Sequence, residues 1–208
     1  MSCVLQANQQ KSIATKMKDR KIKVHKLLYE LFGRESTWPD ILAIFAGSFS
    51  LAIMALSTIW EVDLSVIKKI VLAFLAFDIG GGVVANFTTG TNNYYGESSK
   101  KRSFFVLLHV LQPLLLIWIF PNDLYFISII SAFTLLSSLC IINITDTSFQ
   151  RVSAASLLVI GILMVQLLNF SNQFVQLILL FYSIKLILAF SVNWENSHKH
   201  GNGNENST

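Results

Sequence analysis

Residues 41–60 read ILAIFAGSFSLAIMALSTIW and contain no charged side chain. A membrane-spanning helix needs about 20 consecutive apolar residues, so this stretch predicts one such helix. Five further apolar segments follow, and the sequence therefore predicts six membrane-spanning helices. The predicted segments are Ile41–Trp60, Val66–Phe87, Ser103–Phe120, Leu124–Ile144, Ala154–Phe170 and Phe174–Val192.

The composition of the whole chain agrees with a membrane protein. Of its 208 residues, 53% are hydrophobic and only 13% are charged. Soluble domains carry about a quarter charged residues, so both a soluble globular enzyme and a disordered chain are disfavoured. The net charge of +4 does not indicate nucleic-acid binding, because the basic residues gather in the N-terminal arm and one loop. We therefore predict an all-α, polytopic membrane protein.

The residues before the first apolar segment predict a separate cytoplasmic arm, residues 1–38. Apolar side chains at Ile13, Met17, Val24 and Leu28 share a helical stripe, and lysines crowd the remaining positions. This pattern is typical of a basic amphipathic helix lying on a membrane surface, here over residues 13–32. The alternative is a solvated helix packed on its own protein. The six-helix domain is then expected over residues 39–192, followed by a disordered polar tail, 193–208.

The distribution of lysine and arginine predicts how the chain crosses the membrane. If six helices alternate, thirteen basic residues fall on the side of the termini and two, Lys68 and Lys69, on the other. The positive-inside rule then places both termini in the cytoplasm of a cell membrane. The arm and the loop residues Lys100, Lys101 and Arg102 are expected to contact anionic lipid headgroups. The whole loop, Thr88 to Arg102, is expected to be a plain cytoplasmic loop with lipid-anchoring charges. The alternatives are that it closes over the polar layer or binds phosphate-bearing headgroups.

Three ionisable residues, Asp78, His109 and Lys185, lie inside the predicted spans. Each costs at least about 2.5–3.5 kcal/mol at the bilayer centre, so each needs a reason. At about 1.5 Å per residue, all three lie roughly 9–13 Å from the cytoplasmic ends of their helices. Gln112 falls in the same layer, and Asn86 lies nearer the cytoplasmic end. We expect these five side chains to form a polar binding layer.

Two irregularities accompany this layer. Gly80, Gly81 and Gly82 follow Asp78 directly, and such small residues let membrane helices approach closely. Pro113 lacks an N–H, which leaves the carbonyl of His109 without its intrahelical partner. A kink is expected there, with water or a neighbouring donor bound to the carbonyl. Together these features predict a small wet cavity open towards the cytoplasm.

Less specific interpretations stay open at this stage. Asp78 and Lys185 could form a purely structural salt bridge, or the lysine could extend to the cytoplasmic interface instead. His109 could be a buried histidine with ordinary hydrogen bonds. The glycines and Pro113 could serve helix packing alone.

The function predicted from these residues is a small transporter or channel-like protein for a proton or small polar solute. No phosphate-binding loop, metalloprotease motif, serine elbow or CxxC pair occurs, so no metal or cofactor is expected and an enzyme is disfavoured. One alternative is a lipid-acting enzyme using Asp78 and His109 as acid and base. Another is a non-catalytic subunit that binds a partner membrane protein through Gly80–Gly82. A homo-oligomer is also compatible with the sequence.

Overall fold

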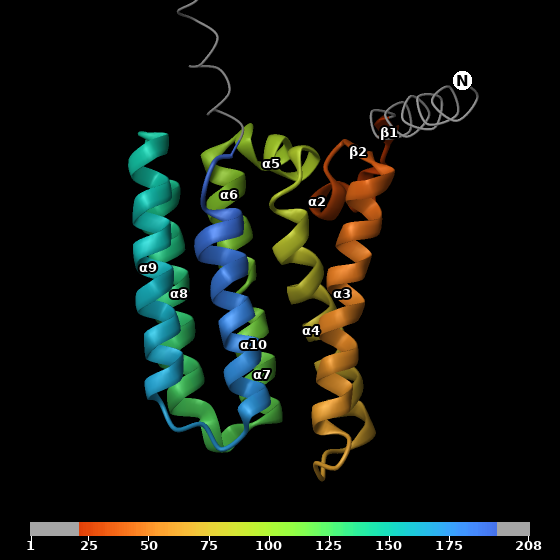
Figure 1. The fold of residues 1–208 in the computed structure, drawn as a ribbon, viewed down its shortest axis with the longest axis vertical. Helices are drawn as coiled ribbons and strands as arrows, with labels where there is room; N and C mark the ends of the chain where they lie inside the picture. The colour runs from red at the N-terminus through yellow and green to blue at the C-terminus, as the bar shows by residue number, and fades with distance from the viewer. Residues whose placement is uncertain (1–20, 195–208) are drawn as a thin grey trace, which may run out of the picture.

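The computed structural model describes residues 21–194, which fold mainly as helices running along one axis (Figure 1). The longer helices are α3 (Trp38–Ile59), α4 (Val66–Ala85), α6 (Ser99–Leu108), α7 (Leu111–Ile119), α8 (Leu124–Ile142), α9 (Thr147–Leu167) and α10 (Gln173–Ser183), which continues as the π-helix η3 (Ile184–Phe190). The shorter elements are β1 (Lys21–Lys23), η1 (Lys26–Leu28), α2 (Tyr29–Phe32), β2 (Glu35–Thr37), α5 (Thr89–Gly96) and η2 (Pro121–Asp123). The predicted disordered tail, except for its first two residues, lies outside this range.

Within residues 21–194, five helical segments are long and apolar enough to cross a membrane. They are α3, α6 with α7, η2 with α8, α9, and α10 with η3. A sixth is reached if α4 is counted together with α5, to which it is bent by 87°. Large apolar side chains such as Phe74 and Leu167 remain 72% and 80% exposed on the outside of the bundle. The prediction of a helical fold is confirmed, and its apolar helices suggest a membrane location.

The arm before α3 is not the continuous helix that was predicted over residues 13–32. Residues 13–20 lie outside the described range, and Lys21–Lys23 is a strand paired antiparallel with β2, with Lys21 opposite Thr37. Among the arm residues that the structure describes, 21–37, only η1 and the four-residue α2 are helical, and α2 ends at Gly33, whose φ is +71°. The reason is the alternation in residues 21–24, where lysines are exposed and Ile22 and Val24 half-buried, which is the period of a strand.

Helices α3 and α4 form a closely packed antiparallel pair. Thr37 and Asp40 form a capping box that begins α3. Gly80 and Gly81 of α4 face α3. A Cβ atom built on Gly80 would collide with the carbonyl oxygen of Gly47, and one on Gly81 would collide with the hydroxyl of Ser48. The predicted close approach therefore occurs between two helices of the same chain.

Near the predicted kink at Pro113, the helical hydrogen bonding is interrupted for two residues between α6 and α7, which together still form one apolar segment long enough to span a membrane. The chain makes tighter bonds at this point, because the N–H groups of His109 and Val110 donate to carbonyls three residues earlier. The carbonyl of His109 accepts from the Tyr182 hydroxyl at 3.2 Å and from the Gln112 N–H at 3.3 Å. The donor expected from the sequence is thus a tyrosine on α10.

The segment expected to be a plain loop contains helix α5, which lies across one end of the bundle (Figure 1). The Thr88 side chain caps its first turn, and its buried side chains Thr91 and Tyr95 pack into the bundle. The Thr91 hydroxyl also donates to the carbonyl of Leu31 at 2.9 Å, which joins α5 to the arm. Packing therefore stabilises a helix whose residues are weak helix formers.

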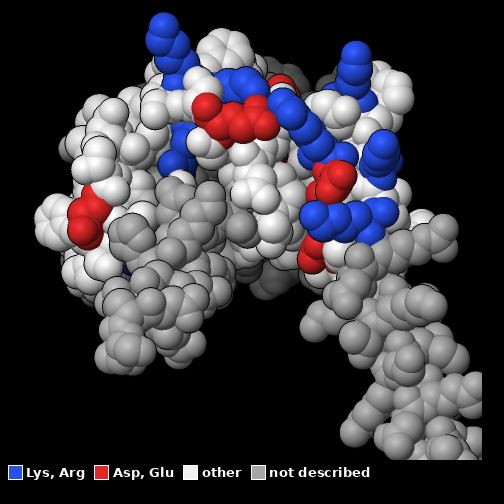
Figure 2. Space-filling view, turned by 90° about the horizontal axis from the view of Figure 1, so that it is seen from above, with Lys and Arg blue, Asp and Glu red and all other residues white. Residues whose placement is uncertain are grey.

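The end of the bundle formed by β1, β2 and α5 carries most of the described basic side chains, as Figure 2 shows. Lys68 and Lys69 stand near the start of α4, at the opposite end. The fold thus separates the two groups of basic residues as predicted, while the side of the membrane that each end faces stays a prediction. Arg102 differs from its neighbours Lys100 and Lys101, since it is only 9% exposed.

Candidate functional site

An ion pair lies between α4 and η3. The Lys185 Nζ atom is 2.7 Å from Oδ2 of Asp78, and it also donates to the Asp78 backbone carbonyl at 3.3 Å. The Gln112 amide, one residue before Pro113, donates to the same Oδ2 atom. The structure therefore brings three members of the predicted polar layer into direct contact. Lys185 pairs with Asp78 and does not extend to the interface.

The two charged partners differ in their access to the surroundings. The Lys185 side chain is 2% exposed, whereas that of Asp78 is 55% exposed. A Cβ atom built on Gly82 would collide with the Lys185 Cε atom, so the glycine makes room for the lysine. An incoming group can therefore reach the carboxylate while the ammonium stays covered.

His109 lies beside this pair but is held by a different contact. Its Nδ1 atom is 2.7 Å from the carbonyl oxygen of Phe105, and its ring packs on the Phe105 ring with centroids 4.2 Å apart. A carbonyl oxygen only accepts, so Nδ1 carries the hydrogen and Nε2 of the neutral ring is an acceptor. His109 makes no hydrogen bond to Asp78 in the described chain.

The polar layer opens onto a cavity of about 430 Å³ between α4, the α6–α7 break and η3. Asp78, Gly82 and Asn86 line it from α4 and its C-terminal cap, as their spacing of four residues predicts. The arm covers it through η1 and α2. The remaining lining residues are Leu27, Leu28, Glu30, Leu31, Ala85, Phe105, Leu108, His109, Leu111, Gln112 and Lys185. All five predicted site residues thus line one cavity, and their binding role stays a prediction.

Two helices lose regular α-helical hydrogen bonding beside this cavity. The α6–α7 break contributes His109, and η3, with its wider turn, contributes Lys185. The Arg102 guanidinium donates to the carbonyls of Phe190 and Ser191 at 2.8 Å each, where η3 ends. π-helical turns often occur at functional sites, and this one is fixed by a buried arginine.

Three residues around the site were missed by sequence reasoning. Tyr182 binds the His109 carbonyl, Arg102 stabilises the end of η3, and Glu30 lines the cavity from α2. Tyr182 lies three residues before Lys185 on the same helix, so the predicted need for a donor near His109 could have identified it. Glu30 carries no comparable signal, because the arm was predicted to lie on a membrane surface.

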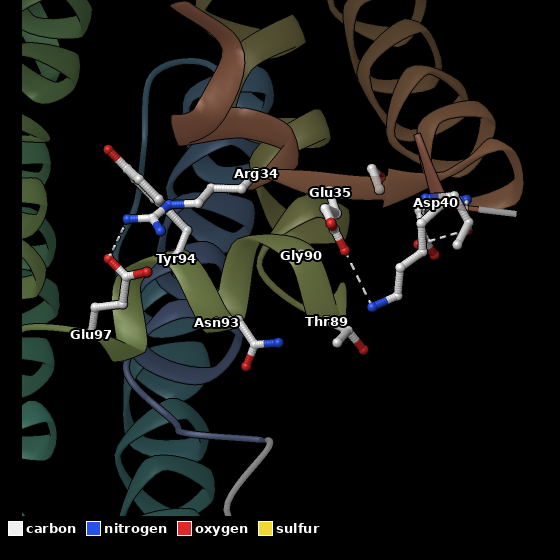
Figure 3. A pocket seen from close by; sticks show the side chains of 11 residues that line it. Arg34, Glu35, Asp40, Thr89, Gly90, Asn93, Tyr94 and Glu97 are labelled. Atoms are coloured by element: carbon white, nitrogen blue, oxygen red, sulfur yellow. Dashed lines mark hydrogen bonds and ion pairs between the residues drawn. The ribbon is translucent and has the colours of Figure 1, made fainter. Parts of the chain in front are cut away.

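A second, smaller pocket of about 250 Å³ lies where the arm meets α5 (Figure 3). Its charged side chains are mostly paired, with Arg34 3.0 Å from Glu97 and Lys21 3.3 Å from Glu35. Gly33 and Gly90 are in such close contact that a Cβ atom on either would collide with backbone of the other segment. This pocket therefore marks the joint that fixes the arm over the bundle.

Within residues 21–194, no group of three or more His, Cys, Asp or Glu side chains gathers as a metal ion would require. Comparison of the chain with protein-family models, with curated proteins and with solved structures found no match.

Proposed function

We propose that the protein is a small multi-pass membrane protein that binds a proton or small polar solute at Asp78 and moves it through the bundle. The observation that carries this proposal is the exposure of the Asp78 carboxylate to a cavity while its partner Lys185 is buried. A carboxylate that is paired with one lysine in an apolar bundle can bind a proton or a solute in place of its contact with that lysine.

The irregular helices support movement as well as binding. Broken helices near the middle of a membrane are a feature of transporter binding sites, because their free backbone groups line the cavity. The α6–α7 break and η3 both border this cavity and contribute His109 and Lys185. Small shifts of either helix would change the contacts of Asp78.

The alternative functions have weaker support. Among the described residues that line the cavity there is no serine or cysteine nucleophile, and His109 bonds to a carbonyl instead of to a carboxylate. The face formed by Gly80 and Gly81 is filled by α3, and Gly82 contacts Lys185, so this face is not free for a partner. We retain the expectation that Lys100 and Lys101, both exposed, contact anionic headgroups.

Proton flux into liposomes tests the proposal. The full chain is reconstituted with an internal pH-sensitive dye, and a pH gradient is imposed. We expect flux well above that of empty liposomes, and a reduction of at least about tenfold in Asp78→Asn, since general acid–base groups commonly contribute 10²–10⁴-fold. Glu61→Gln, an exposed site at the opposite end, is the matched control and should behave as wild type.

Two results would contradict the proposal. One is wild-type flux equal to that of empty liposomes, and the other is undiminished flux in Asp78→Asn. Because Asp78→Asn leaves Lys185 unpaired, the double variant Asp78→Asn with Lys185→Gln is measured beside it as a folded protein without the carboxylate.

A further inference from the structure

The hydrogen-bonding groups around the cavity are mainly acceptors. Oδ1 of Asp78 makes no hydrogen bond within the described chain, because both donors bind Oδ2. Nε2 of His109 is an acceptor, since Nδ1 carries the ring hydrogen. The Gln112 Oε1 atom is buried and accepts no hydrogen bond from residues 21–194. Over the same residues, one buried amide donor around the cavity, Nδ2 of Asn86, has no partner.

The charges around the cavity do not favour an anion. The positive charge of Lys185 is balanced by Asp78 and is 2% exposed, so an anion cannot reach it. Glu30 adds a carboxylate on the α2 side and has no ion-pair partner among residues 21–194. With His109 neutral, one positive and two negative groups leave the lining at −1.

The rest of the wall is apolar. Phe105, Leu108 and Leu111 line the cavity from α6 and α7, and Leu27 and Leu31 line it from the arm. A volume of about 430 Å³ is far larger than an ammonium group alone needs, because one water occupies about 30 Å³. The ligand must therefore have an apolar body as well as a polar end.

We propose that the solute of this cavity is a primary ammonium compound with a short apolar body, whose N–H groups bind Asp78 and His109 and whose positive charge is favoured by the Glu30 carboxylate. This inference rests on the proposed function, since it names the solute class of the same site. A primary ammonium supplies three donors and one positive charge, which match the excess acceptors and the negative lining. Its source is either a free amine or the headgroup of an aminophospholipid.

Binding of n-butylammonium to the full chain tests this inference. The protein is placed in phosphatidylcholine nanodiscs, whose quaternary headgroups have no N–H donor, and titrated calorimetrically. Butyltrimethylammonium keeps the charge without donors, and butyrate reverses the charge. We expect butylammonium to bind at least about tenfold more tightly than either, as charge-assisted hydrogen bonds are among the stronger polar contacts. Equal or tighter binding of butyrate or of butyltrimethylammonium would overturn the proposal.

Variants connect the binding to this cavity. Glu30→Gln lies on the short arm and should weaken butylammonium binding several-fold, while the matched control Glu61→Gln leaves it unchanged. Binding should be lost in the double variant Asp78→Asn with Lys185→Gln, which keeps no unpaired buried charge. Unchanged binding in that double variant would show that the ligand sits elsewhere and would overturn the proposal.

A second set of nanodiscs, containing phosphatidylethanolamine, distinguishes the two sources of the ammonium group. If the lipid headgroup is the ligand, this lipid will compete with butylammonium and weaken its binding. If a free amine is the ligand, the affinity of the protein for butylammonium will be the same in both lipids. Both results support the ammonium class, and absence of binding in both lipids overturns it. Proton flux without butylammonium binding would reject this inference alone, and binding without flux would reject the transport proposal alone.

Discussion

Asp78 and Lys185 are partners of unequal exposure, and this inequality predicts unequal effects of replacing them. Asp78→Asn leaves the buried Lys185 ammonium without its anion, which costs about 3–5 kcal/mol for a buried pair. Lys185→Met leaves a carboxylate whose side chain is 55% exposed and lines the cavity. That loss should be close to the value for exposed pairs, about 1 kcal/mol. Reversible unfolding in mixed micelles would measure both.

A double variant controls for nonspecific damage at this pair. Asp78→Asn with Lys185→Met removes both charges, so it should be more stable than Asp78→Asn alone. Equal losses for the two single variants would show that the exposure difference has no energetic consequence. A double variant less stable than either single variant would argue against an ion pair in the folded protein.

Gly82 allows a second prediction at the scale of one residue. Its added Cβ atom would collide with Lys185, so Gly82→Ala must displace the lysine and should destabilise the protein by about 1–3 kcal/mol. Gly96 is the matched control, because nothing lies within 4 Å of its built Cβ atom. Gly96→Ala in α5 should be neutral or stabilising by up to about 1 kcal/mol. Thermal unfolding that shows equal effects would contradict this assignment of roles.

The residue pattern predicted the polar layer because burial of charge in apolar helices demands partners. Depth alone placed Asp78, Gln112 and Lys185 together, and the structure joins them. The residue pattern left open whether His109 joins the layer or makes ordinary hydrogen bonds, and the structure shows its Nδ1 atom bound to the carbonyl of Phe105 on its own helix. This choice depends on side-chain orientation, which periodicity does not determine.

At the scale of helices, the α6–α7 break and α10 should depend on one another. The Tyr182 hydroxyl binds the His109 carbonyl that Pro113 leaves without a helical partner. Tyr182→Phe should therefore cost about 1 kcal/mol, the usual net value of one hydrogen bond. In a Pro113→Ala background the new N–H can bind that carbonyl, so the same substitution should cost less. The unfolding free energies of the wild type, the two single variants and the double variant give the coupling energy between Tyr182 and Pro113.

A control for this cycle comes from another buried hydroxyl on the same helix. Ser183 bonds to Thr134 at 2.8 Å and does not contact the break. Ser183→Ala should have the same cost whether residue 113 is proline or alanine. If Tyr182→Phe is equally independent of residue 113, the proposed link between the break and α10 is wrong.

The elements that the sequence predicted least well are short and depend on tertiary contacts. Lys21–Lys23 forms a strand because β2 lies beside it, and α5 forms because Thr91 and Tyr95 are buried. Long apolar runs, in contrast, predict helices by length alone. Helix α4 contains three charged residues, Lys68 and Lys69 in its first turn and Asp78 further along, and they interrupt its apolar run. This explains why α4 counts as a membrane span only together with α5.

At the scale of the whole molecule, the two ends of the bundle differ in charge and in cover. The arm and α5 close one end, and most of the basic residues at that end belong to the arm and to the start of α6 (Figure 2). At the other end, the buried Asp123 accepts hydrogen bonds from the Ser171 N–H and hydroxyl at 2.8 and 2.7 Å, which join the loop after α9 to η2. The cavity lies towards the basic end of the bundle, so the orientation of the protein in the membrane decides from which side of the membrane a solute enters.

Cysteine labelling of intact cells tests this orientation. Glu61 lies before α4 and Lys100 lies after α5, near the start of α6, and both are exposed. Single cysteines are placed at these two positions after Cys3 and Cys140 are changed to serine. The positive-inside rule predicts that a membrane-impermeant maleimide labels Glu61→Cys at once, and Lys100→Cys only after permeabilisation. The reverse pattern would invert the orientation and open the cavity to the outside. Labelling of both from one side would mean that α4 does not cross, which would remove Asp78 from the bilayer and with it the energetic reason for its pairing with Lys185.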